Sequence, residues 1–206
     1  MCFLSKPPHG ECNQNRSRSR RHTSALREQD PDLNIDVLPL LDVDLPAFDG
    51  DKAAAKSNVM LGQEHTATQK TAWDQIVEIA SRFIASDRYL FAVPMWNSGI
   101  PYRLKHYIDV THQPGLLWGL KPESGYFGLL ENKHATLVLT AGAYAPSPAF
   151  GVDHHSAYLH AWLSQGGVTA IDEVRFEPTL LTQDPAGDFE QAKCAAMELA
   201  HTHDRI

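Results

Sequence analysis

The stretch FAVPMWNSGIPYRLKHYID, which runs from Phe91 to Asp109, decides how the chain folds. It begins inside an apolar run, Tyr89–Val93, breaks at Pro94 and restarts as a helix after Pro101. A continuous apolar run of this length is typical of a strand that is buried on both faces of a parallel sheet. Residues 95–100, with the sequence MWNSGI, therefore follow directly on the carboxyl end of a core strand.

Strand patterns and helix patterns alternate along the rest of the chain. Strand patterns occupy Cys2–Ser5, Asn34–Leu40, Tyr89–Val93, Ala135–Thr140 and Thr169–Glu177. Helix patterns occupy a segment that stops near Pro31, Thr71–Ser86, the residues after Pro101, a segment through Tyr158 that ends at Gly166 and Gly167, and Phe189–Leu199. Residues 42–52 read as loop, and residues 112–132 as a long excursion. Such alternation predicts an α/β fold: a doubly wound, five-stranded parallel sheet with helices on both faces.

The composition narrows the class of protein. A length of 206 residues with 43% hydrophobic residues suits a single domain spanning 1–206. The formal net charge of -7 argues against nucleic acid or an anionic membrane as partner, because both favour clustered positive charge. The three cysteines, Cys2, Cys12 and Cys194, lack metal-ligand spacing and predict reduced thiols. Because no apolar run reaches the roughly 20 residues of a membrane span and the N-terminus lacks a signal-peptide pattern, we expect a cytoplasmic protein.

The predicted fold also places a candidate site. In doubly wound sheets, ligands bind outside the carboxyl ends of the strands, near the switch in strand order. Three segments follow such strand ends here: residues 6–16, Met95–Ile100 and Thr140–Tyr144. We therefore expect the functional site where these three loops meet.

The motif PMWNSGIPYRLKHYID resembles the signature of the FMN-dependent NADH:quinone oxidoreductases and NADH-azoreductases, a flavodoxin-like family. Further similar segments follow the order of that family. They are DLPAFDGD, TAWDQI, LVLTAGAY, DHHSAYLHAWLSQGGV and AIDEVRFE. The resemblance covers the chain from about Asp30 onward. It implies a flavodoxin-like fold, FMN as cofactor, and NADH or NADPH as co-substrate. It further implies a ping-pong transfer of two electrons to quinones or azo compounds, and a homodimer that completes the site.

By this resemblance, Met95, Trp96, Asn97 and Ser98 contact the flavin ring and the ribityl chain. The residue types suit that role. Met and Trp offer polarizable apolar surface to a flat ring, and Asn offers donors and an acceptor. Gly99 lets the backbone come close to a ligand. Without the resemblance, the same residues would read as an ordinary strand-to-helix turn with a packed tryptophan.

A second flavin loop is implied at Thr140, Ala141, Gly142 and Ala143, where small residues leave room for the pyrimidine end of the ring. Tyr144 would stand near the ring edge. His155 would lie at the mouth of the site, as a further substrate-side residue. The flavin carries the chemistry in this family, so the resemblance implies no catalytic triad and no metal.

The N-terminal 30 residues depart from the family pattern, in which serines and backbone amides hold the FMN phosphate. Pro7 stands where the first serine belongs, and proline has neither a hydroxyl nor an N–H. One register places Asn13, Gln14 and Asn15 in the phosphate loop, and a shifted register places Ser17, Arg18 and Ser19 there. Both registers could hold an anion. The departure motivates an alternative function, a dimeric binding protein that binds FMN weakly or not at all and has no catalytic activity.

Other readings compete at single sites. The run RSRSRR could form a nucleic-acid patch or a phosphorylation target, but it is one short run in an acidic chain. His154 and His155 beside Asp153 suggest metal ligands, but neighbours on a helix point about 100° apart, so we expect no metal. A flavodoxin-like electron carrier is a further rival, although the excursion at 112–132 speaks against an exposed flavin edge. The physiological acceptor, and the choice between NADH and NADPH, stay open.

Overall fold

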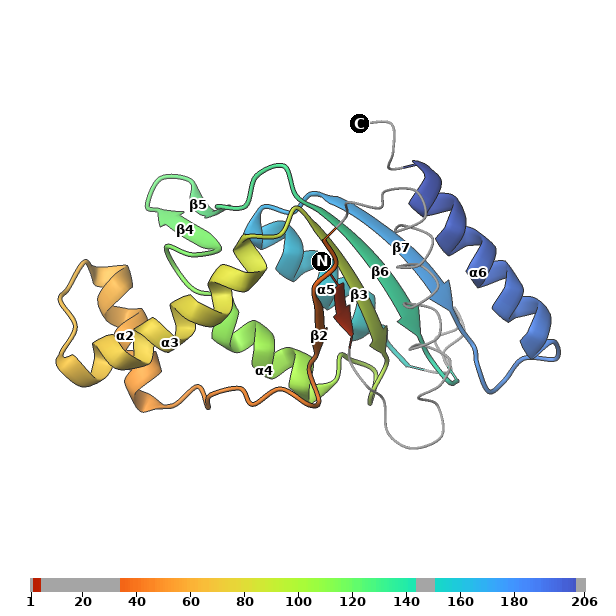
Figure 1. Ribbon diagram of the computed structural model, residues 1–206, viewed down its shortest axis with the longest axis horizontal. Helices are drawn as coiled ribbons and strands as arrows, with labels where there is room; N and C mark the ends of the chain where they lie inside the picture. Colours follow the sequence, from red (N-terminus) through yellow and green to blue (C-terminus); the bar gives the residue numbers. More distant parts are fainter. Residues whose placement is uncertain (1, 5–33, 144–150, 203–206) are drawn as a thin grey trace.

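The computed structural model of the chain describes residues 2–4, 34–143 and 151–202. Its main sheet has five strands, all paired in parallel, in the order β2-β1-β3-β6-β7. The strands are β1 (Cys2–Leu4), β2 (Val37–Pro39), β3 (Arg88–Pro94), β6 (His134–Thr140) and β7 (Ala170–Phe176). The order reverses between β1 and β3, so the topological switch point lies beside β3. Figure 1 shows the carboxyl ends of the strands together at the lower edge of the sheet.

Helices cover both faces of this sheet, as predicted. The helices of the described residues are α2 (Gly50–Leu61), α3 (Ala67–Ile84), α4 (Tyr102–Thr111), α5 (His154–Gly166) and α6 (Pro185–Thr202). α3, α4 and α5 pack through one large apolar cluster on one face, whereas α6 packs against Val174 and Phe176 on the other. Within the described part of the chain, no helix has the combination of length and hydropathy that a membrane crossing requires.

The central strand β3 is buried on both faces, which explains its unbroken apolar sequence. Phe91 and Val93 belong to the large cluster under α3–α5, while Leu90 packs with Val138 on the opposite face. Aromatic rings anchor the helices on the first face: Phe83 stacks on Tyr89 at 4.2 Å between ring centroids, and Trp162 meets Phe91 edge-on at 5.6 Å. The position of α5 over the sheet is therefore fixed by Trp162.

The helix ends follow local sequence signals. α3 starts four residues before the predicted Thr71, because Thr66 and Gln69 form a capping box. Pro101 occupies the N-cap of α4 rather than its first turn. α5 ends at Gly167, whose φ of 103° is open to glycine but costly for other residues.

The loop predicted for residues 42–52 was wrong at its end, where α2 begins at Gly50. The side chain of Asp49 caps this helix by accepting from the Lys52 amide, and the alanines at 53–55 favour helix. Gly50 reads as a loop residue in isolation, but a glycine in the first helical turn is tolerated when the preceding residue caps well.

The excursion at 112–132 contains a hairpin that the sequence did not predict. β4 (Trp118–Lys121) pairs with β5 (Gly125–Gly128) in antiparallel fashion. The hairpin is pressed against the end of α5, where the Leu130 amide donates to the Gly166 carbonyl at 3.0 Å. A Cβ on Gly128 would lie 2.2 Å from the Gly167 nitrogen, so this contact requires glycine.

Candidate functional site

The residues after β3 form a tight turn at the carboxyl edge of the sheet. Trp96 and Gly99 pair in antiparallel fashion: the Trp96 amide donates to Gly99 at 2.8 Å, and the Gly99 amide donates back at 3.0 Å. The two residues between them, Asn97 and Ser98, have φ of 48° and 66°. Positive φ at both central positions is typical of a type I′ turn, which asparagine tolerates better than most residues. We call Met95–Gly99 the flavin turn, after the role that the sequence assigns to it.

The structure brings the two predicted flavin loops together. β3 and β6 end in register, with Pro94 beside Thr140, and the Met95 amide donates to the Thr140 carbonyl at 2.7 Å. Ala141 is 3% exposed, Gly142 is half-buried and Ala143 is exposed. The second loop thus begins in the core and reaches the surface next to the flavin turn.

A third segment, which the sequence did not predict, holds the second loop in place. The Thr179 amide donates to the Ala141 carbonyl at 2.9 Å, and the Leu180 amide donates to the Gly142 carbonyl at 2.8 Å. These residues follow β7, which neighbours β6 in the sheet. Neighbouring parallel strands end at the same edge of a sheet, so the residues after β7 lie beside the loop that follows β6. The sequence pattern did not predict this contact, because it does not specify that β7 is the neighbour of β6.

Several donors in these two loops have no partner among the residues that the structure describes. They are the backbone amides of Asn97, Ser98, Gly142 and Ala143, and the indole Nε1 of Trp96, which is a buried atom. Buried or clustered donors without partners are uncommon in folded proteins. The edge of the sheet therefore offers hydrogen bonds and small-residue space to a ligand with acceptors.

The first turn of α5 packs directly on the flavin turn. The His154 amide donates to the Ser98 carbonyl at 3.0 Å. His154 itself is exposed, while His155 is only 1% exposed, and its burial lowers the pKa to about 4. The sequence places His155 at the mouth of the site; its side chain is buried, and a substrate-side role for it stays a prediction. No group of three metal-ligating side chains occurs within the described residues.

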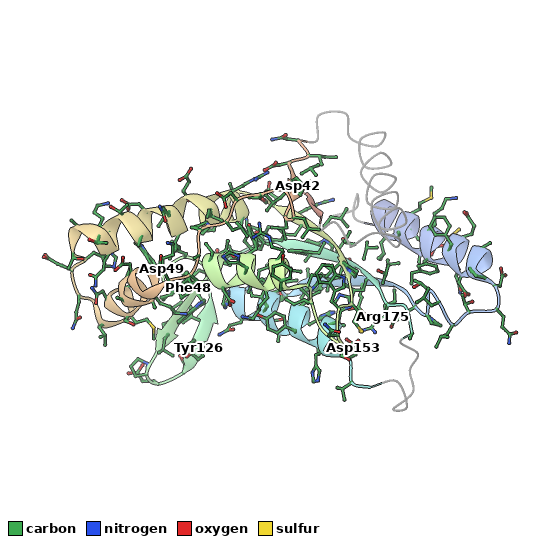
Figure 2. The ribbon with its side chains drawn as sticks, turned by 90° about the horizontal axis from the view of Figure 1, so that it is seen from below. Asp42, Phe48, Asp49, Tyr126, Asp153 and Arg175 are labelled. Carbon is green, nitrogen blue, oxygen red and sulfur yellow. The ribbon has the colours of Figure 1, made fainter. Side chains whose placement is uncertain are left out.

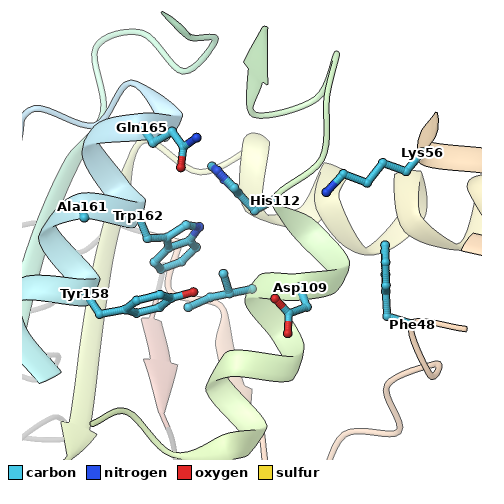
Figure 3. A pocket seen from close by; sticks show the side chains of 9 residues that line it. Phe48, Lys56, Asp109, His112, Tyr158, Ala161, Trp162 and Gln165 are labelled. Carbon is cyan, nitrogen blue, oxygen red and sulfur yellow. The ribbon is translucent and has the colours of Figure 1, made fainter. Parts of the chain in front are cut away.

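A separate pocket of about 410 Å³ lies in the helical layer (Figure 3). Its walls come from the loop before α2, from α2, and from the facing sides of α4 and α5. They are Phe48, Lys56, Ile108, Asp109, His112, Tyr158, Ala161, Trp162 and Gln165. Asp109 lies seven residues after Tyr102 on α4, which separates these two residues by about 10 Å along the helix axis. None of the residues that line the pocket belongs to Met95–Gly99.

The pocket combines aromatic walls with one unneutralised cation. The Lys56 ammonium lies 6.0 Å from the ring centre of Phe48 and 5.9 Å from that of Trp118, and it pairs with no carboxylate of the described residues. Asp109 is neutralised by Lys105 instead. Burial lowers the pKa of His112 to about 4, and Gln165 opposes this shift only in part. At neutral pH the lining therefore carries the positive charge of Lys56 beside a neutral histidine.

The sequence did not predict this pocket or its residues Lys56 and Gln165, since neither residue belongs to a recognisable binding motif. It also missed the cap role of Asp153, although an acidic residue just before a helix is a readable N-cap signal. Predicted phosphate-loop residues lie outside the described residues. They are Asn13, Gln14, Asn15, Ser17 and Ser19. Tyr144 also lies outside the described residues.

The sheet order and the site at the carboxyl edge define a flavodoxin-like protein. The sequence profile of a family described as having a flavodoxin-like fold matches residues 3–199. A protein of Ruegeria pomeroyi named FMN-dependent NADH:quinone oxidoreductase is 42% identical over 190 residues, which cover 91% of this chain and 93% of that protein. A protein of the same name in Desulfotalea psychrophila is 41% identical over 154 residues, covering 74% and 73%. The chain belongs to this flavodoxin-like family, together with relatives named FMN-dependent NADH:quinone oxidoreductase.

Solved structures agree on the fold. An azoreductase from Bacillus anthracis superposes with a TM-score of 0.86 at 22% identity, over 98% of both chains. An FMN-dependent NADH-azoreductase from the same species, solved in complex with FMN, gives a TM-score of 0.83 at 20% identity, over 98% of this chain and 97% of the other. These likenesses confirm the predicted flavodoxin-like architecture.

Proposed function

We propose that the protein is an FMN-dependent enzyme that passes two electrons from NADH or NADPH to quinones or azo compounds. The observation that carries this proposal is the flavin turn: its sequence resembles that of the family, and it lies with the second loop at the switch-point edge of the sheet. The names of the relatives support the same activity.

The residues at this edge fit a flavin. Met95 and Trp96 are half-buried and offer apolar surface for a flat ring. Amides in both loops that bond to no described residue, at Asn97 and Gly142 among others, suit the carbonyl oxygens and ring nitrogens of an isoalloxazine. Small side chains at Ala141 and Ala143 leave the edge open. The loop proposed for the phosphate falls outside the described residues, so the fit concerns the ring and ribityl half of the cofactor.

Bound FMN would supply two-electron redox chemistry, and the protein would supply orientation and a dry environment. We infer a ping-pong sequence, because both the pyridine nucleotide and the acceptor must meet the same face at the edge of the sheet. The flavin turn would fix the ring through backbone donors, which change position less than long side chains do. In this mechanism, no residue of the flavin turn transfers a proton.

We infer that a second copy of the chain completes the site. None of the residues that line the pocket at Lys56 and Trp162 belongs to the flavin turn, which leaves this face available to a flavin held by another copy. The hairpin carries exposed apolar residues: Leu120 is 49%, Tyr126 58% and Phe127 38% exposed. The Tyr126 ring lies 5.1 Å from the ring of Trp118, which in turn lies 5.9 Å from the Lys56 ammonium. In a homodimer this face would form the acceptor-side wall over the flavin of the other copy.

Purified protein with added FMN tests the cofactor first. We expect a flavin absorption spectrum at one FMN per chain after removal of free cofactor. NADH should then be oxidised only when benzoquinone or methyl red is present. A protein that takes up no FMN would contradict the proposal and favour the non-catalytic binding protein. Size-exclusion chromatography with light scattering, which gives the mass in solution, tests the homodimer separately.

A further inference from the structure

Among the described residues, one backbone hydrogen bond from another element reaches the central residues of the flavin turn. The Ser98 carbonyl accepts from the His154 amide at 3.0 Å, and His154 is the first residue of α5. Asn97 and Ser98 both have positive φ, a conformation that costs energy in residues other than glycine. The direction of the Ser98 carbonyl therefore depends on where α5 begins.

The start of α5 is fixed by Asp153. One carboxylate oxygen accepts from the amides of His155 at 2.8 Å and Ser156 at 3.0 Å. The other oxygen accepts from the Arg175 guanidinium at 2.8 Å. Figure 2 shows Asp153 and Arg175 side by side, with Arg175 reaching over from β7. Burial alone would raise the pKa of Asp153, but the two amides and Arg175 hold it below its usual value.

Arg175 is itself held by two further carboxylates. It donates to Glu173 on β7 and, at 2.7 Å, to Glu177. Glu173 also accepts from the Ser156 hydroxyl at 2.6 Å and lies 3.0 Å from the His160 ring nitrogen. The guanidinium thus joins three carboxylates, and its flat fork can meet several acceptors at fixed angles. Burial raises the pKa of Glu177, and Arg175 offsets this shift only in part.

We propose that Arg175 is a positioning residue for the flavin turn. It acts through Asp153 and the first turn of α5 on the carbonyl of Ser98. The chain of contacts is continuous: Arg175 to Asp153, Asp153 to the α5 amides, and His154 to Ser98. The proposal rests on the proposed function to the extent that bound flavin is the first probe of the turn.

Removal of the guanidinium leaves Asp153, Glu173 and Glu177 near one another without a cation. Repulsion between them would shift the Asp153 side chain and, with it, the start of α5. The peptide after Ser98 would lose its fixed direction, and the neighbouring free amides would no longer point to one place. We expect FMN affinity to fall about tenfold.

The experiment compares Arg175→Gln with a matched control, Arg82→Gln. Arg82 forms a two-fold ion pair with Asp36 at 2.6 and 2.5 Å, and its side chain is 39% exposed against 34% for Arg175. That pair links α3 to the segment before β2, the edge strand at the other end of the sheet from β7. Both variants therefore remove an arginine that is ion-paired at the protein surface, Arg82 with one carboxylate and Arg175 with three, but only Arg175 is joined to the flavin turn.

Three measurements separate positioning from general stability: the free energy of unfolding of the apoprotein, the Kd for FMN, and the visible absorption spectrum of bound FMN. We expect both variants to lose stability, Arg175→Gln the more because it leaves three carboxylates near one another, and only Arg175→Gln to raise the Kd about tenfold and shift the flavin bands. Arg175→Lys, which restores the charge, should recover part of the affinity. Equal changes in Kd for the two glutamine variants, or an unchanged Kd in Arg175→Gln, would overturn the proposal.

Amide NMR of the apoprotein keeps the test independent of the proposed function. Arg175→Gln should shift the resonances of Asn97, Ser98 and His154, and Arg82→Gln should leave them in place. If wild-type protein takes up no FMN, the proposed function fails while these shifts still decide the role of Arg175. Absence of the shifts in a folded Arg175→Gln protein contradicts that role.

Discussion

The flavin turn and the pocket in the helical layer are built in different ways. The turn is made by backbone hydrogen bonds among Met95, Trp96, Gly99 and Thr140. The pocket is made by side chains of the loop before α2 and of three helices, and no carboxylate of the described residues pairs with Lys56. Backbone geometry can be specified by one short segment, whereas a side-chain pocket depends on the packing of distant elements. A cofactor common to a family suits the first construction, and variable substrates suit the second.

Burial lowers the pKa of one histidine near each region to about 4: His112 lines the pocket, and His155 lies in the first turn of α5, which packs on the flavin turn. The stability of the protein should therefore depend on pH. The unfolded chain binds these protons near pH 6.5, so stability is full above that pH and falls as pH drops toward 4. The expected slope is about 1.4 kcal/mol per pH unit for each histidine. His155→Gln should remove one histidine's part of the slope between pH 6.5 and 4.5, as measured by urea unfolding of the apoprotein.

The lower end of that window overlaps the range in which Asp153 and Glu173, whose pKa values are lowered, begin to lose stability, because unfolded carboxylates start to bind protons there. His112→Gln should flatten the slope about as much as His155→Gln, because burial lowers both histidine pKa values to about 4. An unchanged slope in His155→Gln would show that this histidine is protonated in the folded protein.

The contact between the hairpin and α5 should be the most sensitive packing point on the pocket side. Gly128→Ala would place a methyl group 2.2 Å from the Gly167 nitrogen. The other nearest atoms also belong to the backbone of Gly166 and Gly167, so no flexible side chain can move to make room. We expect a loss of about 3 kcal/mol in unfolding free energy. Gly50→Ala, where a Cβ meets nothing within 4 Å, is the control. Equal urea midpoints for the two variants would contradict the close approach.

The flavin turn should respond to backbone strain rather than to loss of a side chain. Ser98→Val places a β-branched residue at a φ of 66°, which costs about 1–2 kcal/mol. We expect a roughly tenfold weaker Kd for FMN by titration. Ser98→Gly relieves the strain and should bind FMN at least as well as the serine. If Ser98→Gly binds FMN as weakly as Ser98→Val, the Ser98 hydroxyl contributes more to FMN affinity than the backbone conformation of the turn does.

The smallest effect is expected for Lys56, which should select acceptors by charge. Lys56→Gln should raise the KM for methyl red, a carboxylated azo dye, about fivefold, or roughly 1 kcal/mol. The same dye without its carboxylate should show no change in KM. Lys70→Gln, which removes an exposed lysine paired with Asp74, is the control. A KM change for both dyes would assign Lys56 a role in packing.

The sequence predicted what depends on local chemistry. The apolar runs at Tyr89–Val93 and Ala135–Thr140 became β3 and β6, and the helix with Trp73 to Ile84 on one face became α3. The flavin loops were placed correctly relative to each other, because carboxyl ends of neighbouring parallel strands meet at one edge. The helix at Gly50 and the hairpin were missed, since a glycine and a short excursion carry weak signals of their own.

By itself, then, the sequence determined the doubly wound sheet and the place of Met95–Gly99 at its carboxyl edge, since periodicity and a short motif specify both. Only the tertiary structure decided that Arg175 reaches Asp153 across 22 positions, that His155 is buried, and that Lys56 and Trp162 share a pocket. The physical reason is that side-chain contacts between elements depend on how helices pack on the sheet. That packing follows from the volume and shape of many buried residues together, and no single segment contains it.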